Sequence, residues 1–274
     1  MTDQPDTAAP LLPDIFLASV ALEPNRWKSG DKRRPSLRLG DYAAEAAEAG
    51  FAGWELWEDH LFLNGPGELD ALVDTALPVR VFNTYAIPGQ SAPERLDAVN
   101  NAIAALAPAL RGVKFNLGPA KDEDADPGAQ IEAALRWAER LPEHVRLLCE
   151  CHPGTVIEEP AAAARAFAAW PRERFGAIVH TFGQPPARLG EWFAALGDRI
   201  EHLHIQARDD QRQWSPLAAL EPALRAALAE LRRQSFSGTA ALEFVYGLGR
   251  PGESPESLFA QACDDLAALR ANGW

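Results

Sequence analysis

The sequence reads LLCECH at residues 147–152, AIVHTF at 177–182, IEHLHIQ at 200–206 and AALEFV at 240–245. Each of these apolar stretches carries one or two possible metal ligands near its end, and a helical pattern follows each one. The possible ligands are Glu150, His152, His180, His202, His204 and Glu243. Short apolar runs are typical of strands that are covered on both faces, and strands alternating with helices predict a parallel sheet.

The same alternation extends along the rest of the chain. Eight cycles of a strand followed by a helix can be read with no break in composition, and the 274 residues match the ~250 of a barrel built from eight such units. We therefore predict one α/β domain, a single (β/α)₈ TIM barrel over residues 14–274, preceded by a flexible polar tail at 1–13. Catalytic groups of such barrels lie at the C-terminal ends of the strands, so the ligands should converge on one mouth.

Charge and composition narrow the range of functions. The net charge of −13, from 26 basic and 39 acidic residues, argues against a nucleic-acid partner, which needs basic surface. No apolar run approaches the ~20 residues of a membrane span, and the N-terminus does not resemble a signal peptide. Three cysteines without a CxxC pair favour a reduced, cytoplasmic protein. A small molecule is the expected partner, and a homo-oligomer is possible.

The most informative feature for function is a carboxylate inside each of two apolar strands, at Glu150 and Glu243. Residues i and i+2 of a strand share a face, so Glu150 points the same way as the histidine two residues later. A buried charge is costly unless it is paired or metal-bound, so Glu150 and Glu243 either hold a cation or form salt bridges with core cations. A lone strand histidine is usually core. We expect one of His202 and His204 to be a ligand and the other to support it.

Further polar and aromatic side chains lie near other strand ends. Trp57 could stack on a sugar ring or belong to the barrel rim, and His60 could reach the mouth or be solvated. Lys114 could neutralise Glu55 or a neighbouring carboxylate, or bind a substrate oxygen. The loops after the first two strands, the second of them over residues 58–67, are longer than the ~2–6 residues common in such units and are expected to cover the mouth. Helices are expected over residues 68–76 and 186–196.

Three motifs resemble those of a known family. ECHPGT at 150–155, RIEHLHIQARD at 199–209 and ALEFVYG at 241–247 are similar to motifs of the xylose isomerase-like TIM barrels, specifically the sugar phosphate isomerase/epimerase group. The resemblance implies one divalent metal ion held by Glu150, His180, His204 and Glu243. It also implies that His152 contacts substrate, and Arg208, in the second motif, is expected to do the same.

The sequence departs from the family pattern at two points. His180 stands where an Asp is usual, which changes the formal charge of the ligands from −3 to −2. Imidazole suits Mn, Co, Zn or Fe better than Mg, so one of the former is the expected cofactor. The family also has a histidine three residues further on, which is absent here, and Gln184 is the candidate to supply that contact.

The leading functional hypothesis is a metal-dependent isomerase or epimerase of a sugar or sugar-like hydroxyketone. Glu150 and Glu243 would transfer the proton, and His152 would stabilise the enediolate oxygen. The alternatives are a metal-dependent lyase or hydrolase of an oxidised sugar derivative, an endonuclease-IV-like phosphodiesterase, and a non-catalytic barrel. Six histidines in total and the negative net charge argue against the phosphodiesterase.

Overall fold

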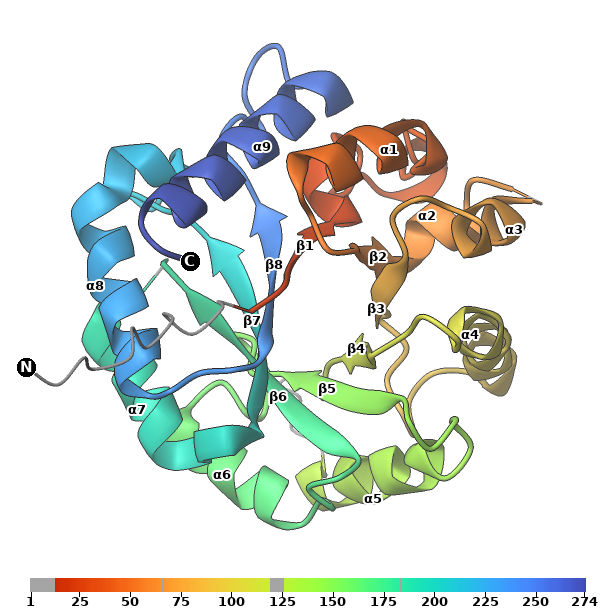
Figure 1. Cartoon of the computed structure of the whole chain (residues 1–274). Helices are drawn as coiled ribbons and strands as arrows, with labels where there is room; N and C mark the ends of the chain where they lie inside the picture. The colour runs from red at the N-terminus through yellow and green to blue at the C-terminus, as the bar shows by residue number, and fades with distance from the viewer. Residues whose placement is uncertain (1–12, 66, 119–125, 183) are drawn as a thin grey trace, which may run out of the picture.

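Eight parallel strands close into a barrel in the computed structural model of the chain (Figure 1). β1 (Ile15–Ala18) pairs with both β2 (Trp54–Trp57) and β8 (Thr239–Phe244), so the sheet closes on itself. The strands between them are β3 (Val79–Asn83), β4 (Gly112–Phe115), β5 (Arg146–Glu150), β6 (Phe175–Thr181) and β7 (Ile200–Gln206). The predicted (β/α)₈ barrel is confirmed.

The structure describes residues 13–65, 67–118, 126–182 and 184–274. Apart from Pro13, the predicted tail at 1–13 lies outside the described residues. None of the described helices is long and apolar enough to cross a membrane.

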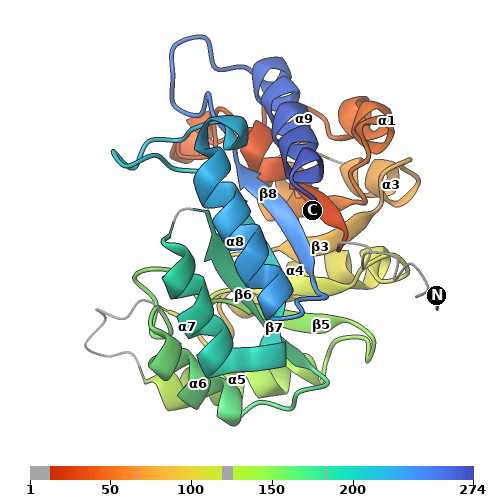
Figure 2. The same cartoon turned by 60° about the vertical axis from the view of Figure 1, so that its left-hand side comes forward.

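Helices surround the barrel, and Figure 2 shows α7, α8 and α9 following one another along its outside. The helices are α1 (Gly40–Ala49), α2 (Glu58–Phe62), α3 (Glu68–Val73), α4 (Pro93–Leu106), α5 (Pro127–Ala138), α6 (Pro160–Ala168), α7 (Pro186–Leu196), α8 (Glu221–Arg233) and α9 (Pro255–Ala271). Each of α4 to α9 has a proline in its first turn, where the missing N–H costs no hydrogen bond. Prolines therefore mark where these helices begin.

The chain after β2 differs from the prediction. Residues 58–67 were expected to form a loop, but 58–62 form the short helix α2, and the helix expected over 68–76 ends at Val73. Glu58 and Asp59 lie in the first turn of α2, where negative charge interacts favourably with the helix dipole. Four 3₁₀ helices complete the described elements: η1 (Ser19–Leu22), η2 (Gly30–Lys32), η3 (Gly197–Arg199) and η4 (Leu217–Leu220).

Alternation along the strands separates two apolar cores. Leu147 and Cys149 of β5 belong to the large core between the barrel and its helices. A small cluster fills the inside of the barrel and consists of Phe16, Ala18, Val20, Trp57, Val81, Leu148, Ile178 and Ala241. The inward positions that come next along β5, β6 and β8 are polar, at Glu150, His180 and Glu243. The barrel interior therefore contains this apolar cluster, and ionisable side chains follow it towards the C-terminal ends of β5, β6 and β8.

Candidate metal centre

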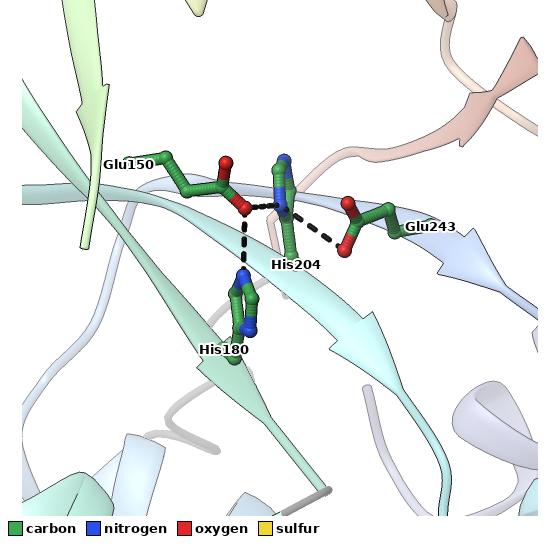
Figure 3. A group of neighbouring side chains, drawn as sticks. All are labelled: Glu150, His180, His204 and Glu243. Atoms are coloured by element: carbon green, nitrogen blue, oxygen red, sulfur yellow. Dashed lines mark hydrogen bonds and ion pairs between the residues drawn. The ribbon is translucent and has the colours of Figure 1, made fainter. Parts of the chain in front are cut away.

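Four side chains from four adjacent strands meet inside the mouth of the barrel. Glu150 of β5, His180 of β6, His204 of β7 and Glu243 of β8 each offer one ligand atom, and these atoms all lie within 4.8 Å of one another (Figure 3). His180 Nε2 lies 2.7 Å from Glu150 Oε1, and His204 Nδ1 lies 3.1 Å from the same oxygen. His204 Nδ1 is also 3.2 Å from Glu243 Oε2. The four residues that the family resemblance implied as ligands are therefore neighbours.

The spacing of these atoms suits a divalent ion. Adjacent ligand atoms around an octahedral ion with bonds of about 2.1 Å lie about 3.0 Å apart, close to the separations found here. Two imidazoles and two carboxylates are a donor set that Mn, Fe, Co and Zn accept well. The residues present thus fit the metal that the strand-end pattern predicts.

Glu150 is held by more than the two imidazoles. Lys114 of β4 places Nζ 2.8 Å from Glu150 Oε2, and Asn116 Nδ2 donates to the same oxygen at 2.9 Å. Burial alone would raise the pKa of the Glu150 carboxyl, but Lys114 and hydrogen bonds from both histidines hold it well below its usual value. Lys114 therefore neutralises a neighbouring carboxylate, the first of its two predicted roles, and Oε1 is the oxygen left to face the histidines.

His204 connects this group to a second tier of polar residues beneath it. Its Nε2 lies 3.1 and 3.2 Å from the two oxygens of Glu55, which also contacts His202 Nε2 at 3.0 Å and Asn83 Nδ2 at 3.0 Å. A proton on Nε2 donated to Glu55 leaves Nδ1 as the nitrogen that faces Glu150 and Glu243. Of the two β7 histidines, His204 thus lies among the candidate ligands, and His202 lies in the tier below.

The charges of the two tiers depend on one another. Burial would lower the pKa of His204, but the carboxylates of Glu243, Glu55 and Glu150 raise it well above its usual value. Burial would raise the pKa of Glu55, but His204 and His202 lower it strongly. Without a cation, a proton on His204 therefore balances the surrounding carboxylates, and a metal ion would take over that role.

One carboxylate oxygen of Glu243 has fewer hydrogen-bond partners than either oxygen of Glu150. Gln206 Nε2 donates to Glu243 Oε2, the oxygen that also faces His204. Among the described residues, Oε1 of Glu243 has no hydrogen-bond donor. Burial acts to raise the pKa of the Glu243 carboxyl, but His204 lowers it overall, so the carboxylate is ionised at neutral pH. Glu243 thus keeps one negatively charged oxygen that accepts no hydrogen bond from the described residues.

A pocket of about 500 Å³ opens at this end of the barrel. His180 and Gln206 line it, and so do three of the predicted substrate-contacting residues, His152, Gln184 and Arg208. His152 Nδ1 donates to the Pro153 carbonyl oxygen at 2.6 Å, which leaves Nε2 for a ligand. A second pocket of about 620 Å³ contains none of the four candidate ligands; it is lined by residues such as Arg111, His144 and Arg146, near the N-terminal ends of the strands. The 500 Å³ pocket is therefore the candidate substrate site.

Two predicted substrate contacts lie elsewhere. Trp57 is 2% exposed and belongs to the apolar cluster inside the barrel, so it forms core and not a platform for a sugar. The prediction that His60 reaches the mouth or solvent is wrong for this structure, because α2 folds it inward. It is fully buried, with Nδ1 2.9 Å from Ser19 Oγ and Nε2 3.3 Å from Glu23 Oε2. The two rings pack edge to face, with their centres 5.3 Å apart.

The loop after β1 approaches the pocket as expected. Its Trp27 is 63% exposed, and its ring centre lies 6.1 Å from that of Phe244, a residue that lines the pocket. Arg26 of the same loop is buried and pairs with Glu253 at 2.8 Å. This ion pair fixes the loop to the segment after β8.

The sequence analysis gave Glu55 only one possible role, as a partner of Lys114, which pairs with Glu150 here. Its position in WELW, two residues before Trp57, places it on the inward face by the same rule that selected Glu150. The signal was present, but nothing in the sequence indicated that Glu55 and His204 would meet across the barrel.

Solved structures with a similar fold include xylose isomerase-like TIM barrel proteins and a sugar phosphate isomerase/epimerase. A 3-keto-D-glucoside 4-epimerase from E. coli is 17% identical with a TM-score of 0.64, over 94% of this chain and 99% of that one. A D-psicose 3-epimerase from Clostridium cellulolyticum H10, crystallised with D-tagatose, is 12% identical with a TM-score of 0.65, over 94% and 98%. A probable 3-DHS dehydratase from Bacillus anthracis is 17% identical with a TM-score of 0.59, over 94% and 99%.

The chain spans only 42% of another match, described as a xylose isomerase-like TIM barrel/4-hydroxyphenylpyruvate dioxygenase fusion protein. No family model matches the sequence, and no curated protein matches it. At these identities the likeness is one of fold. The fold class that the three motifs implied is therefore confirmed, and the reaction has to be argued from the site.

Proposed function

We propose that the protein is a divalent-metal-dependent isomerase or epimerase of a sugar or a sugar-like hydroxyketone. The observation that carries the proposal is the meeting of Glu150, His180, His204 and Glu243 at the mouth of the barrel, beside a pocket of suitable size. These four residues would hold the ion. When bound, a divalent ion polarises a carbonyl and makes the adjacent C–H more acidic.

The two carboxylates are suited to move the proton. Both have lowered pKa values, so both are ionised and able to accept a proton at neutral pH. Glu243 Oε1 is the less occupied oxygen and removes the proton from the carbon next to the carbonyl, which gives an enediolate. Delivery of a proton to the opposite face of that carbon is epimerisation: Glu150 takes up a proton from solvent and delivers it, and the proton on Glu243 passes to solvent. Delivery of the Glu243 proton to the neighbouring carbon, with transfer of the hydroxyl proton to the former carbonyl oxygen, is isomerisation.

His152 and Lys114 complete the assignment. When doubly protonated, His152 donates through Nε2 to the developing oxygen, since Nδ1 is fixed on the Pro153 carbonyl. Lys114 keeps Glu150 ionised. Gln184, whose Nε2 donates to the His180 carbonyl oxygen at 3.2 Å, supports the strand end beside the ligands and faces the pocket.

Elimination is the second candidate reaction. The same base beside the same ion can expel a leaving group from the neighbouring carbon, and one of the structural neighbours is described as a dehydratase. Incubation of the metal-loaded protein with a panel of keto-sugars in heavy water separates the two. An isomerase incorporates deuterium into an isomeric product, whereas an eliminating enzyme gives a product lighter by the leaving group. If neither change occurs with any metal, both proposals fail.

Glu243→Gln tests the metal centre directly. The amide keeps the shape but removes the charge, so the variant should lose bound metal and turnover together. Metal content after purification and dialysis is the measurement, and Glu132→Gln, which alters an exposed carboxylate on α5, is the control. Full metal occupancy in the Glu243 variant would show that the ligand set is wrong.

A further inference from the structure

Two arginines from one loop line the candidate substrate pocket. Arg208 lies two residues after the end of β7, and Arg212 lies four residues further on. Among the residues that the structure describes, neither guanidinium has a carboxylate within 4.0 Å. The pocket also contains His152 and His180, so the two cations lie in the same cavity as the candidate metal centre.

The acidic residues that line this pocket are already engaged. Glu159 pairs with Arg188 at 2.6 Å, and Glu158 Oε2 accepts the Gly154 N–H at 2.6 Å. Asp209 Oδ1 accepts the N–H groups of Gln211 and Gln213, both at 2.9 Å, and thereby closes the turn that carries Arg212. The described acids thus leave the two arginine charges without a partner in a protein of net charge −13.

The loop holds Arg208 in a defined position. Residues 208 and 214 form an antiparallel bridge, and the Ser215 N–H donates to the Ala207 carbonyl oxygen at 3.1 Å. The Arg208 guanidinium lies 3.7 Å from the ring centre of Trp214. Stacking of this kind fixes the plane of the guanidinium and leaves its edge free to donate hydrogen bonds.

The two arginines lie on the same turn. Arg208 Nη1 donates a hydrogen bond to the Arg212 carbonyl oxygen at 3.4 Å, so the Arg212 backbone lies beside the Arg208 guanidinium. Burial, and after it the charge of Arg212, lowers the pKa of Arg208. An anion bound between the two side chains would relieve this repulsion. Planar guanidinium groups match carboxylate and phosphate oxygens in geometry as well as in charge.

We propose that Arg208 and Arg212 bind an oxyanion group of the substrate, a carboxylate or a phosphate, so that the substrate is an acidic sugar and not a neutral one. The hydroxyketone end would lie at Glu150, His180, His204 and Glu243, and the anion at the loop after β7. The position of the sugar rests on the proposed function, whereas binding of the anion by the two arginines does not.

The test compares three six-carbon probes that the enzyme cannot turn over: D-glucitol, D-glucitol 6-phosphate and D-gluconate. Their dissociation constants are measured by calorimetry on the metal-loaded protein and on the same protein after chelation. We expect at least one anionic probe to bind about tenfold or more tightly than D-glucitol, because a hydrogen bond to a charged group is worth that much. The preferred anion identifies phosphate or carboxylate as the source. The preference should shrink at high salt.

Arg208→Gln and Arg212→Gln should each reduce the ratio between the neutral and anionic dissociation constants towards one. Arg165→Gln, on the exposed face of α6, makes the same charge change away from the pocket and should leave the ratio unchanged. A ratio near one in the wild type, or a preference that survives both substitutions, overturns the proposal. The test is distinct from that of the isomerase: an arginine-dependent preference without keto-sugar turnover would reject the reaction and keep the anion site. Keto-sugar turnover without a preference for the anionic probes would reject the anion site and keep the proposed reaction.

Discussion

His180 is the residue at which this candidate site differs most from the family pattern. Its Nε2 contacts Glu150 Oε1 at 2.7 Å, and its ring stacks beside that of His204 with centres 5.5 Å apart. An imidazole in this place contributes no negative charge. It therefore affects both how tightly a cation is held and which cation is preferred.

We expect His180→Asp to accept Mg²⁺ more readily than the wild type, because the extra carboxylate makes the site harder and more anionic. His180→Ala should weaken Mn²⁺ binding by about tenfold or more, since one of four ligands is lost. Metal titrations of both variants are the measurement. His152→Ala is the control, because His152 lines the pocket outside the ligand group. Equal Mn²⁺ affinity in His180→Ala and the wild type would remove His180 from the ligand set.

Glu55 offers a second test, because it acts only through His204. Partners that orient a ligating histidine typically contribute 10–100-fold to metal affinity. Glu55→Gln should therefore weaken Mn²⁺ binding by about tenfold, although Glu55 is not expected to touch the ion. Glu58→Gln, at a carboxylate that is equally buried but bonds Thr84 and Tyr85, should not. The idea fails if the two variants bind Mn²⁺ alike.

For the residues at the strand ends, the sequence predicts which side chains face into the barrel but not which of them meet. The period of two along a strand predicted that Glu150, His204 and Glu243 face inward, and they do. It could not decide between His202 and His204, since both face the same way. That choice depends on the stagger between strands: His204 pairs in register with His180, whereas Glu150 pairs with Ile178. The register offset between neighbouring strands is set by closure of the barrel, so it cannot be read from the sequence of a single strand.

At the scale of elements, helices with proline starts and apolar strands were predicted closely. α7 was expected over 186–196 and forms Pro186–Leu196. The short helix α2 was not predicted, because its five residues are too few to show a helical period. Irregular pairing was also hidden, as between Ile205 and Gln206, where the β7–β8 register shifts beside the candidate site. Tertiary packing decides such details.

The contact between α9 and η4 predicts a pH effect on stability. Asp265 is 2% exposed, and its Oδ1 accepts the Leu217 N–H at 2.9 Å and Gln261 Nε2 at 3.0 Å. Burial raises the pKa of this carboxyl from 3.8 to about 6. A raised folded-state pKa favours the protonated form, so this contribution to stability is complete below about pH 4 and is lost as the pH rises through about 6.

Asp265→Asn should remove this loss, since the amide oxygen can still accept both hydrogen bonds. Between pH 4 and pH 7 the free energy of unfolding of the variant should rise relative to that of the wild type by about 3 kcal/mol at most. Urea unfolding at a series of pH values measures the difference. Asp264→Asn, at the exposed neighbour, is the control and should show little change. A pH-independent difference for Asp265→Asn would refute the assignment.

At the scale of the whole molecule, the candidate metal centre joins four consecutive strands, β5 to β8. An ion that binds the folded state alone stabilises it by an amount that grows with the logarithm of its concentration. Addition of Mn²⁺ should therefore raise the melting temperature and chelation should lower it. Because the ligands come from half of the barrel wall, local opening of any of these strands has to break the site.

The effect of metal binding on local opening of β5 can be measured with a thiol reagent. Cys149 and Cys151 flank Glu150 but lie in the outer core, where burial raises the pKa of both thiols, and Cys263 is only partly buried. Iodoacetamide should reach Cys263 and Cys151, which lines the pocket, before Cys149, which is fully buried in β5 and accessible only when that strand opens. Mn²⁺ should slow the Cys149 phase alone, and a Cys149 phase with the same rate in Mn²⁺ and in chelator would contradict the coupling. The alkylation rate of Cys149 thus reports how often the barrel wall opens.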